Sequence, residues 1–406
     1  MHVAVVHSAF VLYWVARIRA LAAVLGQRGD KVSAIETLAD VPGYEFASGT
    51  AGAWTGVSRY RCRRDDPCSP SAARTARHLW ALLEELQPDA VLAAPVAFPE
   101  GAVPIRWCKA HGKVVVVMDD VRSQDVVRSW FVEMVKRSVY QNVDAMLVPA
   151  PSHAESFLRW GVPRERIFFG LDVVDNDWFA EQVAELRSKA DELRLRYRLP
   201  RRFFLGIGRQ VAVKHWHSLI AAYGQYRREA SGRAWDLVLV GDGLERQRLE
   251  TQVAEGDIQG VLFAPFCSQE DLCVYYALAE ALVLPSSNET WGLVVNEAMA
   301  SGLPVLVSNR CGCAATLVRE GKNGWTFSPD DTTQMADTLT RMACLDGGSR
   351  RAMGERSRAI ISEWPLRRFA ERAIAAIDFC KNPEHGDRRS RIGQWVLRMW
   401  NGRYGR

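Results

Sequence analysis

Short apolar runs alternate with longer amphipathic stretches along almost the whole chain. In the first half the apolar runs are HVAVVH, KVSAIE, DAVLAAP, KVVVVMD, DAMLVP and IFFGLDV, and helix-like stretches such as SAARTARHLWALLEEL lie between them. Each run is continuous rather than alternating, which is typical of a parallel strand covered on both faces. This order predicts a doubly wound, Rossmann-like α/β domain over residues 1–175.

The same alternation starts again after a charged, strand-free stretch, residues 176–200, which we interpret as a linker. The runs RFFLGIG, DLVLVGDG, VLFAPF, ALVLPS and PVLVSN follow, with stretches such as WHSLIAAYGQYRREA between them. They predict a second Rossmann-like domain over residues 201–363. Two such domains in tandem predict a ligand cleft that faces the carboxyl ends of both sets of strands.

The two ends of the chain predict further elements. HVAVVH at residues 2–7 indicates a strand rather than a signal peptide, because no basic segment precedes it and Arg17 and Arg19 interrupt the apolar stretch that follows. Residues 364–380 predict a helix that packs back on the first domain. Residues 384–406 form a basic tail.

Composition narrows the class of protein. A chain of 406 residues is long enough for two domains, and 48% hydrophobic with 24% charged residues is the composition of a soluble globular protein. The net charge of +5 is too small to indicate binding of duplex nucleic acid. The nine cysteines form no CxxC pair and no zinc spacing with histidine, so we expect free thiols in a reducing cytoplasm and no bound metal ion.

Two glycine-rich turns follow strands of the second domain. In GIGRQVAVKHW the third glycine of a dinucleotide fingerprint is absent, but Arg209 and Lys214 stand just after the strand, where two cations suit a diphosphate. Two solvated surface cations are the alternative. The turn LVGDG is the second, and close approach of a donor to the backbone is expected at Gly208, Gly241 and Gly243.

The stretch SSNETWGLVVNEAMASGLPV carries two carboxylates, Glu289 and Glu297, around the start of a predicted helix. The first amides of this helix, at Gly292, Leu293 and Val294, suit an anion because they lack acceptors within the helix and lie at the positive end of its dipole. Carboxylates on either side of a phosphate would bind hydroxyl groups, one on a sugar and one on a ribose, which is the pattern of a nucleotide-sugar. Otherwise Glu289 is a helix-entry charge and Glu297 a solvated helix residue.

These motifs resemble those of the family 4 glycosyltransferases, retaining enzymes of the GT-B fold that include bacterial enzymes of glycan assembly. The likeness covers about residues 203–346 and rests on GIGRQVAVKHWHSLIAAY, LVGDG, NETWGLVVNEAMASGLPVLVSN and LVREGKNGWTF. It implies that Arg209 and Lys214 bind the donor diphosphate together with the helix amides. It also implies that Glu289 binds the donor sugar and Glu297 the ribose, in a metal-independent reaction without a cofactor. The implied catalytic residues are Arg209, Lys214 and Glu289.

The first domain resembles the family only weakly, and the departures concern the acceptor. HSAFVLYW stands where the family commonly has a Gly-Gly loop, and Asp119 and Asp120 follow the strand after which a histidine is common. These aspartates would bind an acceptor or sugar hydroxyl, and capping a helix is the alternative. CGCAATLV lacks the usual acidic residue near Thr316. The DND at residues 175–177 mimics a metal-binding motif, but we interpret it as a linker turn.

Residues 387–406 carry six arginines against one aspartate. On a helix, Ile392, Trp395, Val396 and Met399 share one face with arginines around it, which suits an anionic membrane surface. Docking on the protein's own first domain and disorder are the alternatives.

Together these patterns predict a two-domain α/β protein of the GT-B type, with two Rossmann-like doubly wound domains facing a central cleft. The expected activity is a retaining transfer, of the hexosyltransferase type, from a nucleotide-diphosphate sugar to a glycan or lipid-linked acceptor in polysaccharide or glycoconjugate synthesis. The alternatives are an inverting transferase or phosphorylase of the same fold and a non-catalytic nucleotide-sugar-binding protein. We expect a cytoplasmic protein, held peripherally at the inner face of the cell membrane by its tail, with no nucleic acid partner.

Overall fold

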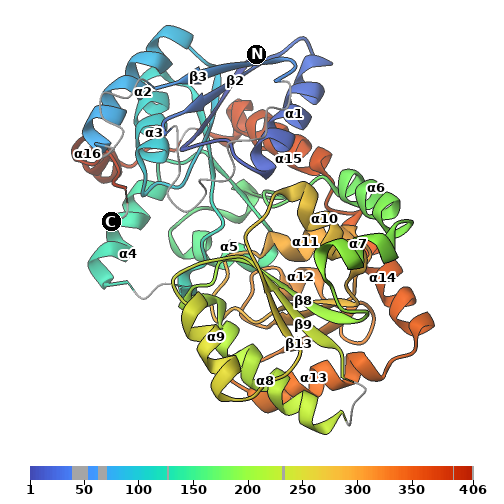
Figure 1. Ribbon diagram of the computed structural model, residues 1–406. Coiled ribbons are helices and arrows are strands. Elements are labelled where there is room, and N and C mark those ends of the chain that lie inside the picture. The colour runs from blue at the N-terminus through green and yellow to red at the C-terminus, as the bar shows by residue number, and fades with distance from the viewer. Residues whose placement is uncertain (39–53, 63–70, 126–127, 231–233, 387, 405–406) are drawn as a thin grey trace. The chain divides into compact units, whose positions relative to one another are not determined.

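The computed structural model describes the chain except for residues 39–53, 63–70, 126–127, 231–233, 387 and 405–406. The described residues form two compact units, one made of residues 1–173 and 366–406 and the other of residues 174–365. Each unit contains a parallel sheet with helices packed on it, as the apolar runs predict (Figure 1).

The sheet of the first unit has seven strands in the order β3-β2-β1-β4-β5-β6-β7, and every neighbouring pair is parallel. The order reverses between β1 and β4, and ligands of doubly wound sheets bind at the carboxyl ends of the strands on either side of such a switch. The strands are β1 (His2–His7), β2 (Lys31–Glu36), β3 (Val57–Arg61), β4 (Ala90–Ala93), β5 (Val114–Met118), β6 (Ala145–Val148) and β7 (Ile167–Phe169).

The helices of the first unit pack on both sides of this sheet. Helix α1 packs against α15, which also lies along β5, β6 and β7, whereas α2 packs against α3 (Figure 1). The C-terminal helix α16 packs on α3 and α4. The helices are α1 (Tyr13–Gly26), α2 (Ala72–Leu86), α3 (Pro99–His111), α4 (Trp130–Tyr140), α5 (Pro151–Arg159), α15 (Leu366–Lys381) and α16 (Arg391–Met399).

The sheet of the second unit has six parallel strands in the order β10-β9-β8-β11-β12-β13, and its switch point lies between β8 and β11. The strands are β8 (Phe203–Ile207), β9 (Asp236–Val240), β10 (Val261–Ala264), β11 (Ala281–Leu284), β12 (Val305–Ser308) and β13 (Gly324–Phe327). The helices are α6 (Asn176–Arg187), α7 (Ala190–Tyr197), α8 (Trp216–Glu229), α9 (Arg246–Glu255), α10 (Gln269–Leu278), α11 (Leu293–Ala300), α12 (Ala314–Leu317), α13 (Thr332–Cys344) and α14 (Gly347–Ile361).

The stretch interpreted as a linker is part of the second unit. Residues 176–200 form α6 and α7, and α6 packs against α10 and α11. Phe179, Val183 and Leu193 are buried, so a few apolar positions in this charged stretch are enough to fix both helices to the unit. The turn predicted at DND is a helix start, because the side chain of Asp175 accepts from the backbone N–H of Trp178 at 3.1 Å.

Two strands carry no apolar run in the sequence. β3 (VSRYR) lies at the edge of its sheet and is mostly exposed, so that no continuous apolar stretch marks it. β13 (GWTF) is an edge strand of four residues that begins at Gly324, where a Cβ atom would collide with the backbone of Val305. Edge strands are short and partly exposed, and the hydrophobic pattern therefore indicates them poorly.

Two general properties concern the described residues as a whole. Within them the eight cysteines are free thiols. No helix in the same part of the chain is long and apolar enough to cross a membrane.

Candidate functional site

The loops that carry the predicted donor residues lie together at one edge of the second sheet. β8 pairs with β11 at the switch point, so the loops after these strands leave the carboxyl edge side by side. The loop after β8 carries Arg209 and Lys214, and the loop after β11 carries Glu289. Lys214 and Glu289 are separated by 75 positions in sequence and are in contact in the fold.

Lys214 and Glu289 form an ion pair between the two loops, and their side chains are 15% and 18% exposed. The hydroxyl of Ser286 donates to the paired oxygen of Glu289 at 3.1 Å. The backbone N–H of Ser287 donates to the carbonyl of Val213 at 2.9 Å, which fixes one loop against the other. The pair is thus held in place by the fold and still open to solvent, and a ligand with charged and hydroxyl groups could reach both side chains.

The glycines of the two turns have a structural reason. A Cβ at Gly241 would collide with the carbonyl oxygen of Gly208, and one at Gly243 would collide with that of Gln210. The φ angles of Gly241 and Gly243 are +138° and +154°. These two glycines let the loops after β8 and β9 pack against each other, so their presence does not require a nearby ligand. Gly208 differs, because the space beside it contains Lys214, whose Nζ would lie 3.7 Å from a Cβ there.

Helix α11 starts next to the ion pair. Gly292 precedes it with φ +102°, and a Cβ at this position would lie 3.4 Å from Cγ of Glu289. The first amides of the helix, at Gly292, Leu293 and Val294, have no acceptor within the helix by construction. The start is fixed from below by Trp291, which is buried and donates from Nε1 to Oδ1 of Asn296 at 2.9 Å. A helix N-terminus and a carboxylate therefore lie within a few ångströms of each other.

Glu297 lies one turn into α11 and is fully buried. It accepts a hydrogen bond from the hydroxyl of Tyr276 on α10 at 2.5 Å. Glu297 is therefore not a solvated helix residue, and the fold holds its carboxylate in one place.

Other residues of this edge complete the site. Arg209 is exposed, and its carbonyl accepts from Nε1 of Trp216 at 3.0 Å, which holds the backbone of the loop. The loop after β12, which carries CGC, also reaches the site: Gly312 donates to the carbonyl of Glu289 at 2.9 Å, and Cys313 donates to that of Trp291 at 3.1 Å. Sequence reasoning noted CGC only as a departure and did not place it against Glu289.

Asp119 and Asp120 lie at the carboxyl end of β5 in the first unit. Asp119 is buried and accepts from the hydroxyl of Tyr140 at 2.7 Å and from the backbone N–H of Val121 at 3.0 Å. Burial raises the pKa of Asp119 to about 6, and the charge of Asp120 contributes to the shift. Asp119 thus anchors the end of β5 to α4, whereas Asp120 is the more accessible of the two.

A buried ion pair close to Asp120 has no signal in the sequence. Arg17 on α1 contacts Asp172 at 3.3 Å and donates from Nε to the carbonyl of Val173 at 3.0 Å. Burial raises the pKa of Asp172 to about 7, with Arg17 opposing the rise and Asp120 adding to it. In the sequence Arg17 only interrupts an apolar stretch, and its partner is 155 positions away.

His7, at the end of β1, belongs to the same region. Its ring lies 4.5 Å from that of Trp14, between centroids, and Nδ1 lies 2.9 Å from the carbonyl oxygen of Ala9. Burial lowers the pKa of His7 to about 4, so the imidazole is neutral at physiological pH.

Comparison with known proteins assigns the second unit first. Residues 191–360 match the family described as Glycosyl transferases group 1. The D-inositol 3-phosphate glycosyltransferase of Thermomonospora curvata is 33% identical over 195 residues, which are 45% of this chain and 44% of the relative. The alpha-D-kanosaminyltransferase of Streptomyces kanamyceticus is 33% identical over 183 residues, which are 45% of this chain and 46% of the relative. Each match thus spans less than half of the relative's length.

Solved structures extend the likeness to both units. The sucrose-phosphate synthase of Thermosynechococcus elongatus has a TM-score of 0.70 at 19% identity, covering 93% of this chain and 98% of that chain. The Anabaena protein HepE, in complex with UDP and glucose, has a TM-score of 0.68 at 17% identity, covering 93% of this chain and 100% of that chain. At these identities the likeness shows the fold alone, and the fold is the two-domain α/β GT-B fold that the sequence predicts.

Proposed function

We propose that the protein is a retaining glycosyltransferase that moves a sugar from a nucleotide-diphosphate donor to a glycan or lipid-linked acceptor. Its donor site is the carboxyl edge of the second sheet. The family matched by residues 191–360 supports sugar transfer as the reaction class. The complex of HepE with UDP and glucose supports a nucleotide-sugar as the donor class.

One observation carries the proposal, the ion pair of Lys214 and Glu289 beside the first turn of α11. A cation, a carboxylate and a helix N-terminus are the groups that a sugar diphosphate needs, because its phosphates are anionic and its sugar offers hydroxyl donors. In the absence of a donor the cation and the carboxylate neutralise each other. A bound diphosphate would take over Lys214 and leave Glu289 for the sugar hydroxyls.

The chemistry asked of these residues is electrostatic. When the bond between sugar and phosphate breaks, negative charge grows on the departing diphosphate, and Arg209, Lys214 and the amides of Gly292–Val294 would stabilise it. A retaining course needs no dedicated protein base, because the departing phosphate can accept the proton of the acceptor hydroxyl. Glu297, fixed by Tyr276, would bind the ribose.

A thermal-shift panel tests the donor site. The full chain is titrated with UDP-, GDP-, ADP- and dTDP-sugars and with the matching free nucleotides. A cognate donor raises Tm in proportion to occupancy, by about 2.7 kcal/mol of stability at a hundred times its Kd. The Glu289→Ala variant should lose the extra shift that the sugar adds to the nucleotide. Equal shifts with every compound, or none, would contradict the proposed site.

The configuration of the product tests the reaction. Proton NMR of the newly formed anomeric centre distinguishes retention from inversion, and an inverted product would assign an inverting transferase of the same fold. Binding of a donor without transfer to any glycan or lipid-linked acceptor would favour a non-catalytic nucleotide-sugar-binding protein. We expect turnover to be unaffected by chelator, and recovery of lost activity by manganese alone would overturn metal independence.

A further inference from the structure

Helix α4 exposes large apolar side chains in the first unit. Trp130 is 76% exposed, and Phe131 and Met134 are also exposed. At 100° per residue these three side chains fall within one face of the helix. Soluble proteins seldom leave several aromatic and methionine side chains together in water without a partner.

Helix α16 exposes a second set. Ile392, Trp395 and Met399 are 69%, 65% and 74% exposed, whereas Gly393 and Leu397 are buried. The apolar part of this helix is therefore divided. One side docks on the first unit, and the other side remains in water. Docking on the protein and binding to a membrane, which the sequence left as alternatives, are compatible.

The two sets form one surface. A Cβ at Gly393 would collide with the carbonyl oxygen of Ser138, so α16 lies directly on the last turns of α4. We call this the α4–α16 surface, and its apolar members are Trp130, Phe131, Met134, Ile392, Trp395 and Met399.

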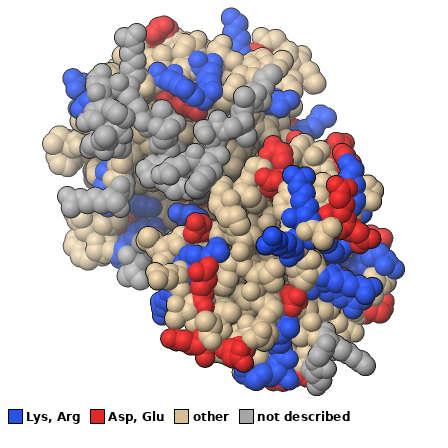
Figure 2. Space-filling model, viewed as in Figure 1, with Lys and Arg blue, Asp and Glu red and all other residues tan. Residues whose placement is uncertain are grey.

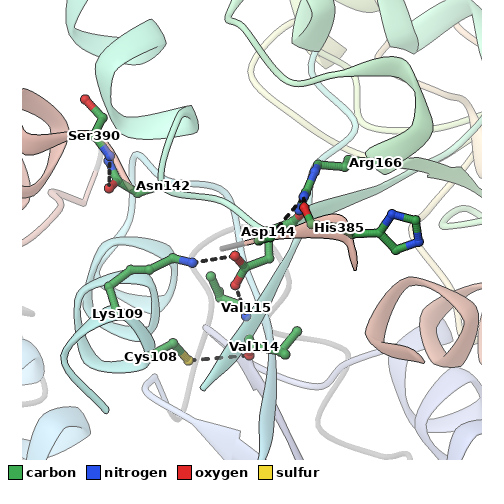
Figure 3. Close-up of polar contacts among 10 residues, drawn as sticks. Cys108, Lys109, Val114, Val115, Asn142, Asp144, Arg166, His385 and Ser390 are labelled. Carbon is green, nitrogen blue, oxygen red and sulfur yellow. Dashed lines mark hydrogen bonds and ion pairs between the residues drawn. The ribbon is translucent and has the colours of Figure 1, made fainter. Parts of the chain in front are cut away.

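Hydrogen bonds hold α16 in this position. The backbone N–H of Ser390 donates to Oδ1 of Asn142 at 2.9 Å, and Arg166 donates to the carbonyls of His385 and Gly386 (Figure 3). After the helix, Nε1 of Trp400 donates to the carbonyl of Val96 at 3.2 Å. The tail is thus fixed before and after α16, and its exposed face is preorganised.

The charge around this surface has one sign over most of its rim. Arg391 and Arg398 are exposed and stand four residues before and three residues after Trp395, so both flank its ring on the helix surface. Arg137 is exposed on α4, whose one acidic residue, Glu133, accepts from Nε1 of Trp160 at 2.6 Å. No acidic residue occurs between positions 388 and 404. On the second unit, by contrast, acidic and basic side chains are interspersed (Figure 2).

We infer that the α4–α16 surface docks the protein on an anionic lipid bilayer. Tryptophan, phenylalanine and methionine would enter the boundary between headgroups and acyl chains, and the arginines would contact anionic headgroups. A second copy of this chain would bring the arginine rims together, which the charge disfavours. The inference does not depend on the reaction proposed for the second unit.

Vesicle sedimentation of the full chain tests this surface. The vesicles are phosphatidylcholine alone or phosphatidylcholine with phosphatidylglycerol. We expect binding to the anionic vesicles only. Arg391→Gln with Arg398→Gln should weaken it about thirtyfold, at about fivefold for each arginine. Trp130→Ser with Trp395→Ser should weaken it at least tenfold.

Matched variants in the second unit are the controls. Leu244→Ser removes a side chain that is 95% exposed, and Arg351→Gln with Arg356→Gln removes two exposed arginines. Both should bind as the unchanged protein does, and all variants should keep its circular dichroism and Tm, since every changed residue is exposed. No binding to anionic vesicles, or equal losses in surface and control variants, would overturn the inference. So would a dimer in light scattering that Trp130→Ser with Trp395→Ser abolishes while vesicle binding persists.

Discussion

The two units carry polar clusters at corresponding edges of their sheets, and the clusters differ in burial. In the second unit Lys214 and Glu289 pair in loops that remain partly open to water. In the first unit Arg17 and Asp172 pair in the interior, beside a buried Asp119 whose pKa is raised to about 6. The first arrangement suits exchange of a partner for a ligand, because breaking it costs little when solvent and ligand replace the contact. The second arrangement suits a fixed structure, since removing either partner leaves a buried charge.

The difference teaches where chemistry is to be sought on each unit. On the second unit, the ion pair itself is the candidate for contact with the donor. On the first unit, the buried pair positions the surrounding backbone, and Asp120 is the carboxylate with access to solvent. The following predictions test this division, from the largest expected effect to the smallest.

Removing the cation of the open pair should have the largest effect on function. Lys214→Ala should lower turnover with the cognate nucleotide-sugar by about a thousandfold, the upper range for loss of one group that stabilises a developing charge. Initial rates measure it. Lys322→Ala, an exposed lysine of the same unit, is the control and should be near normal. If Asp120→Asn lowered turnover more than Lys214→Ala, the division between the two units would be wrong.

Adding one methyl group at Gly241 should destabilise the fold strongly. The new Cβ would collide with the carbonyl of Gly208, and φ there is +138°. Strain and overpacking together predict a loss of about 4 kcal/mol in the free energy of unfolding, measured by denaturant titration. Gly112→Ala is the control for the φ term alone, since φ is +65° and no atom lies within 4 Å of its Cβ; about 1 kcal/mol is expected. Similar losses in both variants would show that the loop contact is unimportant.

The buried carboxyl of Asp119 should make stability depend on pH. Its pKa is raised from 3.8 to about 6, so the folded state binds more protons than the unfolded state between these values. The free energy of unfolding should therefore fall as pH rises from about 4 to about 6, by about 3 kcal/mol.

Asp119→Asn should remove this slope, because the amide does not titrate. Asp337→Asn, which changes an exposed aspartate, should keep it. Urea titrations at pH 4, 5, 6 and 7 measure both. A slope that survives in Asp119→Asn would assign the titration to another group.

The smallest effect is expected at the buried carboxylate of the second unit. Glu297→Gln should raise the KM for the donor about tenfold with little change in kcat, because the amide binds ribose hydroxyls more weakly than the carboxylate does. The Tyr276 hydroxyl would still have an oxygen acceptor. Tyr276→Phe separates the two roles of this pair, and it should change KM less than Glu297→Gln does. The reverse order would mean that Glu297 acts only as a structural partner of Tyr276.

Much of the fold could be predicted from the sequence, and the failures have a common cause. Eleven of the strands coincide with apolar runs, because both faces of a central parallel strand are buried and its residues are apolar throughout. The edge strands β3 and β13 lack such a run. The stretch 176–200 was expected as a linker because its charges outnumber the apolar residues, although three buried side chains fix it to the second unit.

The candidate donor site was predicted residue by residue, because its groups follow strand ends and a helix start, features that a local sequence shows. What the sequence missed there is the loop with CGC, whose backbone binds the carbonyls of Glu289 and Trp291. Those contacts involve only backbone atoms, and no residue type signals them.

By itself, the sequence determined the class of the fold and the residues of the candidate donor site, because hydrophobic periodicity and strand-end motifs are written in short stretches of chain. Only the tertiary structure decided which charges meet. It paired Arg17 with Asp172, buried Glu297 beneath Tyr276, and placed one side of α16 on α4 while leaving the other in water. Burial and charge pairing depend on neighbours that are distant in sequence, and these neighbours exist only once the chain has folded.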